Sequence, residues 1–247
     1  YNVGTIVRYN ISQNDKHHIF GLTCHITDTM IYNNTIYADE GVDNIVSVYS
    51  RDGIKMPINT QIYNNIFYTN SGIFEWKKST GTVFKNNIVY GENAHLYPQN
   101  DGAYDDGDNI EASGNIYADP MLIKPGGAGI GRDTCGVYRL KPESPAIGAG
   151  LIIEDETNTV DFFGNEVSQT QAPNIGAYNG EGIVLVAGDN NYDGQLTVID
   201  VLHLRKYLVK LSDSAIINKD YTDMNEDGKI NIADLLGIRK ILAKTEE

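Results

Sequence analysis

Short runs of β-branched and aromatic residues, each interrupted by asparagine, recur through the N-terminal part of the chain. The runs fall at residues 7–11, 31–37, 62–68, 84–90 and 112–117. Each run places apolar side chains on both sides of its asparagine, which is typical of two short strands that meet at a turn. No long stretch in this part has helical periodicity. The pattern therefore predicts an all-β domain.

The asparagines set the period of this domain. They lie at positions 10, 34, 65, 87 and 115, so successive repeats are 24, 31, 22 and 28 residues apart. Repeats of 20 to 50 residues indicate supersecondary units that stack on one another. A residue such as Asn34 tolerates left-handed backbone geometry, and its amide can bond to the units above and below. We expect an asparagine ladder along the stack.

This repeat resembles the right-handed parallel β-helix, in which a repeated asparagine marks one turn of every coil. A β-sandwich is the alternative, although sandwiches do not repeat asparagine at coil-like intervals. Four later segments resemble the closing segment of secreted β-helix carbohydrate enzymes: residues 117–120, 138–150, 161–164 and 173–178. We expect this segment to cap the last coil, whose edge would otherwise invite aggregation.

Near the C-terminus the pattern changes to two polar loops, which begin at Asp189 and Asp223. Each loop has oxygen-bearing side chains at positions 1, 3, 5 and 12 and glycine at position 6. This is the pattern of an EF-hand calcium loop with Asp in place of the final Glu. With the position 7 carbonyl included, the expected ligands are Asp189, Asn191, Asp193, Gln195 and Asp200 in the first loop, and Asp223, Asn225, Asp227, Lys229 and Asp234 in the second. The sequence predicts two Ca²⁺ ions.

An apolar helical pattern follows each loop, at residues 201–208 and 235–242. Apolar residues recur at three- and four-residue steps, so the two helices are expected to bury one face each against the other. So small a unit has little core, and calcium should contribute folding free energy. An EF-hand calcium sensor is an alternative, but sensors expose a Met-rich groove and only Met224 lies near these loops.

Two loop–helix copies with Arg-Lys in each helix resemble a dockerin module of the bacterial cellulosome, over residues 188–244. The resemblance implies a small all-α module whose partner is a cohesin domain of a scaffoldin. Carried over residue by residue, the contact positions are Val198, Ile199, Arg205, Lys206 and Lys210 in the first copy, and Ile232, Ala233, Arg239, Lys240 and Lys244 in the second. The apolar pairs differ from the Ser-Thr pair of many type I dockerins, which leaves the cohesin class open.

Both copies share this apolar-then-basic pattern, so either helix could lead the contact, in two orientations related by a half turn. The alternative is that Val198, Ile199 and Ile232 pack in the small core. The expected organisation is a parallel β-helix with its closing segment at residues 1–180, a linker at 181–187 and the dockerin at 188–247.

The acidic composition narrows the range of partners. The chain of 247 residues has net charge −14 and no basic stripe, so nucleic acid is not an expected partner. No segment approaches the eighteen apolar residues of a membrane span, so no membrane is expected either. The chain begins at Tyr1 rather than Met, which suggests a piece of a longer secreted precursor. We expect Cys24 and Cys135 to be isolated buried thiols, with a disulfide between them as the alternative.

The two resemblances together imply a secreted, extracellular cellulosome enzyme that degrades plant cell-wall polysaccharide. Glycoside hydrolase family 141, with xylan as substrate, is the specific family resembled, on residues 8–15 and the closing segment. A glycosidase needs two carboxyl groups about 5–5.5 Å or 6.5–9.5 Å apart. The candidates on loops after early coils are Asp15 and Asp28, then Asp39 and Glu40. Asp15 is preferred because it directly follows a strand.

Two alternatives remain for the first domain. It could be a non-catalytic β-helix that binds glycan or serves as a spacer, with Trp76 either stacking on sugar or filling space between coils. It could also be a pectate-lyase-like polysaccharide lyase. In that case the acidic cluster of Asp101, Asp105, Asp106 and Asp108 could hold a calcium bridge to an acidic sugar. Five coils are few for an enzyme of this fold, so part of the catalytic domain is expected to be missing.

Overall fold

The computed structural model describes residues 2–49, 55–76, 79–92, 110–154, 160–211 and 217–245. The chain divides into two compact units. The first comprises Tyr1–Met121 and Glu143–Glu181, and the second comprises Leu122–Pro142 and Gly182–Glu247. Leu122–Pro142, which we expected within the β-helix domain, therefore packs with the C-terminal unit.

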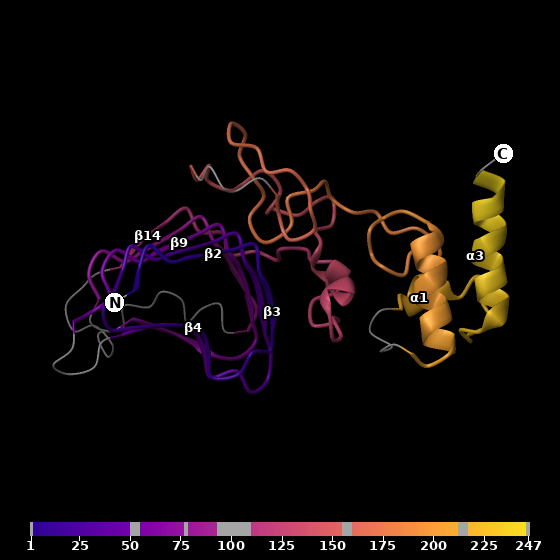
Figure 1. Cartoon of the computed structure of the whole chain (residues 1–247), viewed down its shortest axis with the longest axis horizontal. Helices are drawn as coiled ribbons and strands as arrows, with labels where there is room; N and C mark the ends of the chain where they lie inside the picture. The colour runs from indigo at the N-terminus through magenta and orange to yellow at the C-terminus, as the bar shows by residue number, and fades with distance from the viewer. Residues whose placement is uncertain are drawn as a thin grey trace. The chain divides into compact units, whose positions relative to one another are not determined.

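The first unit is a parallel β-helix, which confirms the predicted fold class. Every strand pair in its sheets is parallel, and each sheet takes strands from successive coils. One sheet contains β2 (Ile6–Arg8), β6 (Met30–Tyr32), β9 (Gln61–Tyr63), β12 (Val83–Lys85) and β14 (Glu111–Ser113). The next sheet contains β3 (Ile11–Gln13), β7 (Thr35–Ala38), β10 (Ile66–Thr69) and β13 (Ile88–Tyr90). A third contains β4 (His18–Thr23), β8 (Asn44–Tyr49) and β11 (Ile73–Trp76), and β1 (Asn2–Val3) pairs with β5 (Ile26–Thr27). Figure 1 shows β2, β9 and β14 along one side of the stacked coils and β3 and β4 on the others.

The register keeps similar side chains in line along the inside of the stack. Ile31 pairs with Ile62, and Ile62 pairs with Phe84. All three are 0% exposed and belong to one core cluster. The ring of Phe67 stacks on that of Phe84 with centroids 5.6 Å apart. Trp76 lies in the same core, so it fills space between coils and is not placed to stack on a sugar.

The expected asparagine ladder is present at all five positions. Asn34 donates its backbone N–H and its side-chain Nδ2 to Oδ1 of Asn65, at 3.0 and 2.9 Å, and Nδ2 also donates to the Val7 carbonyl of the previous coil. The same backbone-to-amide bond joins Asn10 to Asn34, Asn65 to Asn87, and Asn87 to Asn115. Each ladder amide thus satisfies buried backbone groups of two coils.

The residues with left-handed backbone conformation are not the ladder asparagines that we expected. Asn33, Asn64 and Asn86 have φ of 52°, 54° and 50°, one position before each ladder asparagine. The expectation for Asn34 was wrong, because that residue uses its backbone N–H to continue the ladder and the preceding residue makes the sharp turn.

The closing segment also takes a different place from the one predicted. The Nδ2 groups of Asn33, Asn64 and Asn86 donate to the carbonyls of Asn174, Leu151 and Ala149, at 2.7, 2.9 and 3.2 Å respectively. The segment therefore runs along the side of three coils and does not simply cap the last one. The physical reason is that the outward amides of the left-handed asparagines need acceptors.

The second unit is helical. Its described residues form a 3₁₀ helix η2 (Arg132–Tyr138) and the α-helices α1 (Val198–Leu208), α2 (Lys219–Thr222) and α3 (Ile232–Thr245). A small core of Leu204, Ile217, Leu235 and Ile238 joins α1 to α3. In the described part of the chain, no helix has the length and apolar character needed to cross a membrane.

Candidate functional site

The first loop arranges its oxygen atoms through hydrogen bonds that its own backbone donates. Gly194 N–H donates to Asp189 Oδ2 at 2.8 Å, and Asp193 N–H donates to Oδ1 at 3.2 Å. Asn191 Oδ1 accepts from the same Asp193 N–H at 3.1 Å, so the position 1 and position 3 oxygens lie close together. Gly194 makes this turn possible because its φ is 80°, a left-handed value that side chains disfavour.

The loop is closed by Asp200, which is also part of the first turn of α1. Its Oδ1 accepts the N–H of Asn190 at 2.8 Å, and its Oδ2 accepts the N–H of Thr197 at 2.8 Å. Thr197 in turn caps the helix by accepting the N–H of Ile199, which completes a capping box. One carboxylate therefore fixes the start of α1 to the start of the loop.

The second loop repeats this network 34 residues later. Gly228 N–H donates to Asp223 Oδ2 at 2.7 Å and Asp227 N–H to Oδ1 at 3.2 Å. Asp234 Oδ1 accepts from Met224 at 2.9 Å and its Oδ2 accepts from Asn231 at 2.8 Å. The side chains of Gln195 and Lys229, at position 7, are both exposed. This suits a position that contributes only its carbonyl.

The two loops differ in how deeply they are buried. Asp189, Asn190 and Asp200 are 0% exposed and Tyr192 is 3% exposed. In the second loop only Asp234 is buried to that degree, while residues 225–229 are exposed. Similar ligand patterns therefore sit in unequal surroundings.

The donor set of each loop fits a hard cation. The pKa of Asp189 is raised to about 6, mainly by burial and also by the charges of Asp193 and Asp200, while hydrogen bonds from the Gly194 and Asp193 N–H groups act in the opposite direction. A cation would relieve this crowding of like charge. Within the described residues no three His, Cys, Asp or Glu side chains form a metal-binding group by themselves. A calcium site in either loop would therefore draw on amide oxygens, such as those of Asn191 and Asn225, and on a backbone carbonyl, which are usual ligands of this ion.

The predicted contact positions lie on the surface of α1 and α3. Val198 is 71% exposed, Ile199 is 49% exposed and Ile232 is 61% exposed, so these side chains do not pack in the small core. Of the other predicted positions, Lys206 is half-buried and the rest are exposed: Ala233, Arg205, Lys210, Arg239, Lys240 and Lys244.

Two further apolar side chains extend this surface. Leu202 and Leu236 are each 49% exposed, one helical turn after Val198 and Ile232 respectively. Neither residue was among the predicted contact positions. The sequence spacing could have predicted their exposure. Each leucine follows an apolar contact position, Val198 or Ile232, by four residues, and residues i and i+4 share a helix face.

The catalytic candidates of the β-helix are placed at different corners. Asp15 lies between β3 and β4, and Asp28 lies between β5 and β6; both are exposed. The six residues of β4 separate them, a length of about 20 Å. The structure does not bring this pair together, so each stands as a separate candidate.

Asp39 lies at the same corner as Asp15, on the next coil. Its backbone N–H donates to Asn14 Oδ1 at 2.8 Å, and neighbouring strands lie about 4.8 Å apart. Ser12 donates to Asp15 at 2.7 Å, and Tyr37 donates to Asp39 at 3.2 Å. Burial, together with the charge of Asp39, raises the pKa of Tyr37 to about 12. The register therefore places Asp15 and Asp39 at equivalent positions on adjacent coils.

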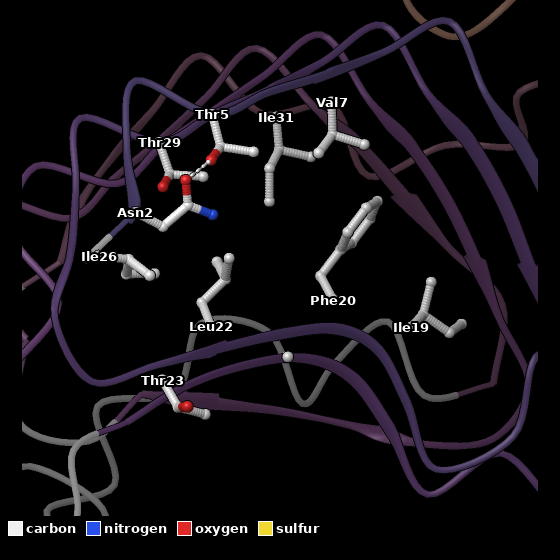
Figure 2. Close-up of a pocket in the computed structure, with 11 residues that line it drawn as sticks. Asn2, Thr5, Val7, Ile19, Phe20, Leu22, Thr23, Ile26, Thr29 and Ile31 are labelled. Carbon is white, nitrogen blue, oxygen red and sulfur yellow. Dashed lines mark hydrogen bonds between the residues drawn. The ribbon is translucent and has the colours of Figure 1, made fainter.

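A cavity of about 320 Å³ opens inside the first coil (Figure 2). Val7, Phe20, Leu22 and Ile31 from three strands point into it, and Asn2 bonds to Thr5 at one end. Because its described lining is mostly apolar and contains no carboxyl group, it is the continuation of the β-helix core and not a hydrolytic site.

Cys24 and Cys135 are both free, as expected, but each is only half-buried and not buried as predicted. The acidic cluster of Asp101, Asp105, Asp106 and Asp108 lies outside the described residues.

Fold and site together define a parallel β-helix protein that carries a duplicated calcium-loop module. Residues 187–243 match the family described as Dockerin type I domain. Calcium binding is a property of this family and agrees with the oxygen donor sets of the two loops. The chain is also similar to a lacto-N-biosidase of Bifidobacterium longum subsp. longum, at 28% identity over 201 residues. That alignment covers 78% of this chain but only 12% of the relative.

Proposed function

We propose that residues 187–243 dock this chain onto a cohesin domain of a scaffoldin, in an extracellular cellulosome, with one Ca²⁺ in each loop. The observation that carries the proposal is the duplicated loop network, which presents an exposed apolar and basic face on both α1 and α3. The match to the Dockerin type I domain supports it.

The apolar centre of each face would supply most of the affinity. Val198, Ile199 and Leu202 on α1, and Ile232 and Leu236 on α3, are all at least 49% exposed. Full burial of such a side chain contributes about 1.5–3 kcal/mol. The basic residues around each centre, such as Arg205 and Arg239, would then select an acidic partner and accelerate association.

The chain's own carboxylates connect the metal to the docking face. Asp200 and Asp234 close the loops and also lie in the first turns of α1 and α3. When bound, calcium supplies a positive charge that the grouped carboxylates share. Holding these carboxylates fixes the starting points of both helices, and hence the spacing of Val198 and Ile232.

The docking proposal is tested by combining Val198→Asp with Ile232→Asp in the full chain and measuring cohesin binding by calorimetry. We expect at least a 100-fold loss of affinity, because both faces then carry a charge at their centre. Val184→Asp is the matched control, since Val184 is 68% exposed but lies outside both helices. Full binding by the double variant would refute the contact assignment.

For the β-helix we propose glycoside hydrolase activity on plant cell-wall polysaccharide. The fold and the partial similarity to a lacto-N-biosidase support a glycosidase. A xylan-type substrate, as in family 141, remains the specific hypothesis. Asp15 is the first catalytic candidate and Asp39 its proposed partner, with Asp28 as the alternative that sequence reasoning named.

The test is hydrolysis of xylan, pectin and a lacto-N-bioside by the full chain, with product analysis. Asp15→Asn and Asp39→Asn should each abolish any hydrolysis, while Asp28→Asn should retain it. Unsaturated sugar ends among the products would instead indicate a polysaccharide lyase. Glycan binding without any product would support the non-catalytic alternative.

A further inference from the structure

The segment Leu122–Pro142 folds back on itself within the helical unit. Leu122 forms an antiparallel bridge with Leu140, and Ile123 N–H donates to the Arg139 carbonyl at 3.0 Å. Ile183, at the entrance to the calcium-loop module, donates to the Leu140 carbonyl at 2.8 Å. The segment is therefore tied to the chain just before the first loop, within one compact unit.

One side chain of this segment binds the first calcium loop directly. Arg139 Nη1 donates to the carbonyl of Asn191 at 3.1 Å and to that of Tyr192 at 2.8 Å. Gly136 approaches the same loop so closely that a Cβ there would lie 2.1 Å from the Asn191 carbonyl oxygen. A charged donor shared by two successive carbonyls restrains loop positions 3 and 4.

The first loop is also held from its other side. Asn190 Nδ2 donates to the Gly188 carbonyl at 3.0 Å, and Thr222 donates to Asn190 Oδ1. Tyr192, at position 4, is 3% exposed. The first loop is therefore restrained by protein contacts around positions 2, 3 and 4.

The second loop has a different environment at the same positions. Position 2 is Met224, position 3 is Asn225 and position 4 is Glu226, and the last two are exposed. Among the described residues, no side chain donates to the Asn225 or Glu226 carbonyl in the way that Arg139 does in the first loop. Calcium must order this loop with less help from the rest of the chain.

We propose that Leu122–Pro142 is a brace that preorganises the first loop and makes it the tighter of two unequal calcium sites. A preorganised site binds more tightly because less ordering accompanies binding. The Arg139 guanidinium also repels a cation, and the proposal requires that its restraint outweighs this repulsion. This has a consequence for docking, which rests on the proposed function. When calcium is scarce, only the first loop is filled, so α1 is the helix held in the conformation that binds cohesin.

The two sites can be followed separately by NMR during a calcium titration of the full chain. The N–H groups of Gly194 and Gly228 bond to the first carboxylates of their respective loops, so their signals report each site. We expect the Gly194 signal to reach its midpoint at a calcium concentration at least 10-fold lower than that of Gly228. Equal midpoints, or the reverse order, would overturn the proposal.

Arg139→Met tests the brace itself. Loss of a hydrogen bond to a charged group corresponds to about a 10-fold or larger change, so the Gly194 midpoint should rise by that factor and the Gly228 midpoint should stay within 2-fold. Lys141→Met is the matched control, because Lys141 is an exposed basic residue of the same segment. An unchanged or tighter Gly194 site in Arg139→Met would contradict the proposal.

A second variant guards against loss of folding. Gly136→Ala keeps Arg139 but pushes on the Asn191 carbonyl, and it should raise the same midpoint. Circular dichroism at saturating calcium should show full helix content in both variants. If Gly136→Ala and Arg139→Met both fold and both leave the Gly194 midpoint unchanged, the brace is refuted.

The docking consequence is measured at a calcium concentration between the two midpoints. Ile232→Asp should then retain cohesin binding, while Val198→Asp should lose at least 10-fold in affinity. Equal losses would refute the choice of helix even if the calcium sites are unequal. The NMR result does not depend on cohesin, so failure of the docking proposal leaves the brace measurable.

Discussion

The two units of the chain use different chemistry for their buried polar groups. In the β-helix these groups include neutral amides such as Asn65 and Asn87, both 0% exposed and bonded to each other. In the helical unit they include the carboxylates Asp189 and Asp200, also 0% exposed. Neutral amides satisfy one another, whereas neighbouring carboxylates repel and favour a cation. Among the described residues, the buried amides of the first unit therefore pair with one another, whereas the buried carboxylates of the second favour a cation.

Removal of calcium should have the largest effect, and it should affect only the helical unit. With a chelator in excess, we expect α1 and α3 to unfold while the β-helix stays folded, because the core of Leu204, Ile217, Leu235 and Ile238 is small. Hydrogen exchange measures both units in one experiment. Amides of Leu204 and Ile238 should lose protection, and those of Ile62 and Phe84 should keep it. Simultaneous loss in both units would show that they are not independent.

The next largest effect is expected when a buried asparagine of the ladder is replaced, and it should be confined to the stability of the β-helix. Asn65→Ala removes the acceptor of the buried Asn34 N–H and two hydrogen bonds donated to the Ile31 and Tyr63 carbonyls, so the free energy of unfolding of the β-helix should fall by about 3–5 kcal/mol. Asn10→Ala is the control, because Asn10 is an exposed ladder position and should cost about 1 kcal/mol. Denaturant titration in the presence of chelator compares them. If both substitutions lower the free energy of unfolding equally, burial of the ladder asparagines does not determine how much they stabilise the coils.

A smaller effect should follow from loosening the closing segment. Gly176 has φ of 96°, and a Cβ there would lie 2.6 Å from Ile66 Cδ1, so Gly176→Ala should destabilise the β-helix by about 1–3 kcal/mol. Gly164→Ala is matched in conformation, with φ of 94°, but meets no atom within 4 Å. Thermal unfolding should give a clearly lower midpoint for Gly176→Ala than for Gly164→Ala. The reverse order would contradict close packing of the segment on the coils.

The smallest difference is expected between the turn glycines of the two loops. Gly194 and Gly228 have φ of 80° and 76°, so alanine at either costs about 1 kcal/mol. Only Gly194 has a close neighbour, Ile183 Cγ2 at 3.1 Å from a Cβ. Gly194→Ala should therefore cost a few tenths of a kcal/mol more at saturating calcium. Paired denaturant titrations measure the difference, and a larger cost at Gly228 would contradict the more crowded first loop.

Local patterns in the sequence predicted much of this molecule. The calcium loops follow from residue types at fixed positions within twelve residues, and the ladder follows from asparagines that align between short strands. Both features occur as repeated sequence patterns, so each copy of a pattern strengthens the prediction made from the other copies. The exposed state of Val198 and Ile232 agrees with the surface role given by the resemblance.

Contacts between distant segments could not be read in the same way. Arg139 lies 52 positions before Asn191, and nothing periodic links them. The side-chain amide of Asn33 reaches Asn174 across 141 positions, so the course of the closing segment depends on the finished coils. The separation of Asp15 and Asp28 likewise depends on the length of β4, which loop residues alone do not reveal.

The ladder has one more consequence, which concerns the length of the β-helix. Asn34, Asn65 and Asn87 present the same atoms to the coil before and the coil after them. Deleting one whole coil would set Asn34 against Asn87 with the same bonds, whereas deleting part of a coil would break the register. The domain can therefore be shortened or extended in whole coils, as in other repeat proteins whose units contact only their neighbours. Length in this protein is a modular property, which engineering can change one coil at a time.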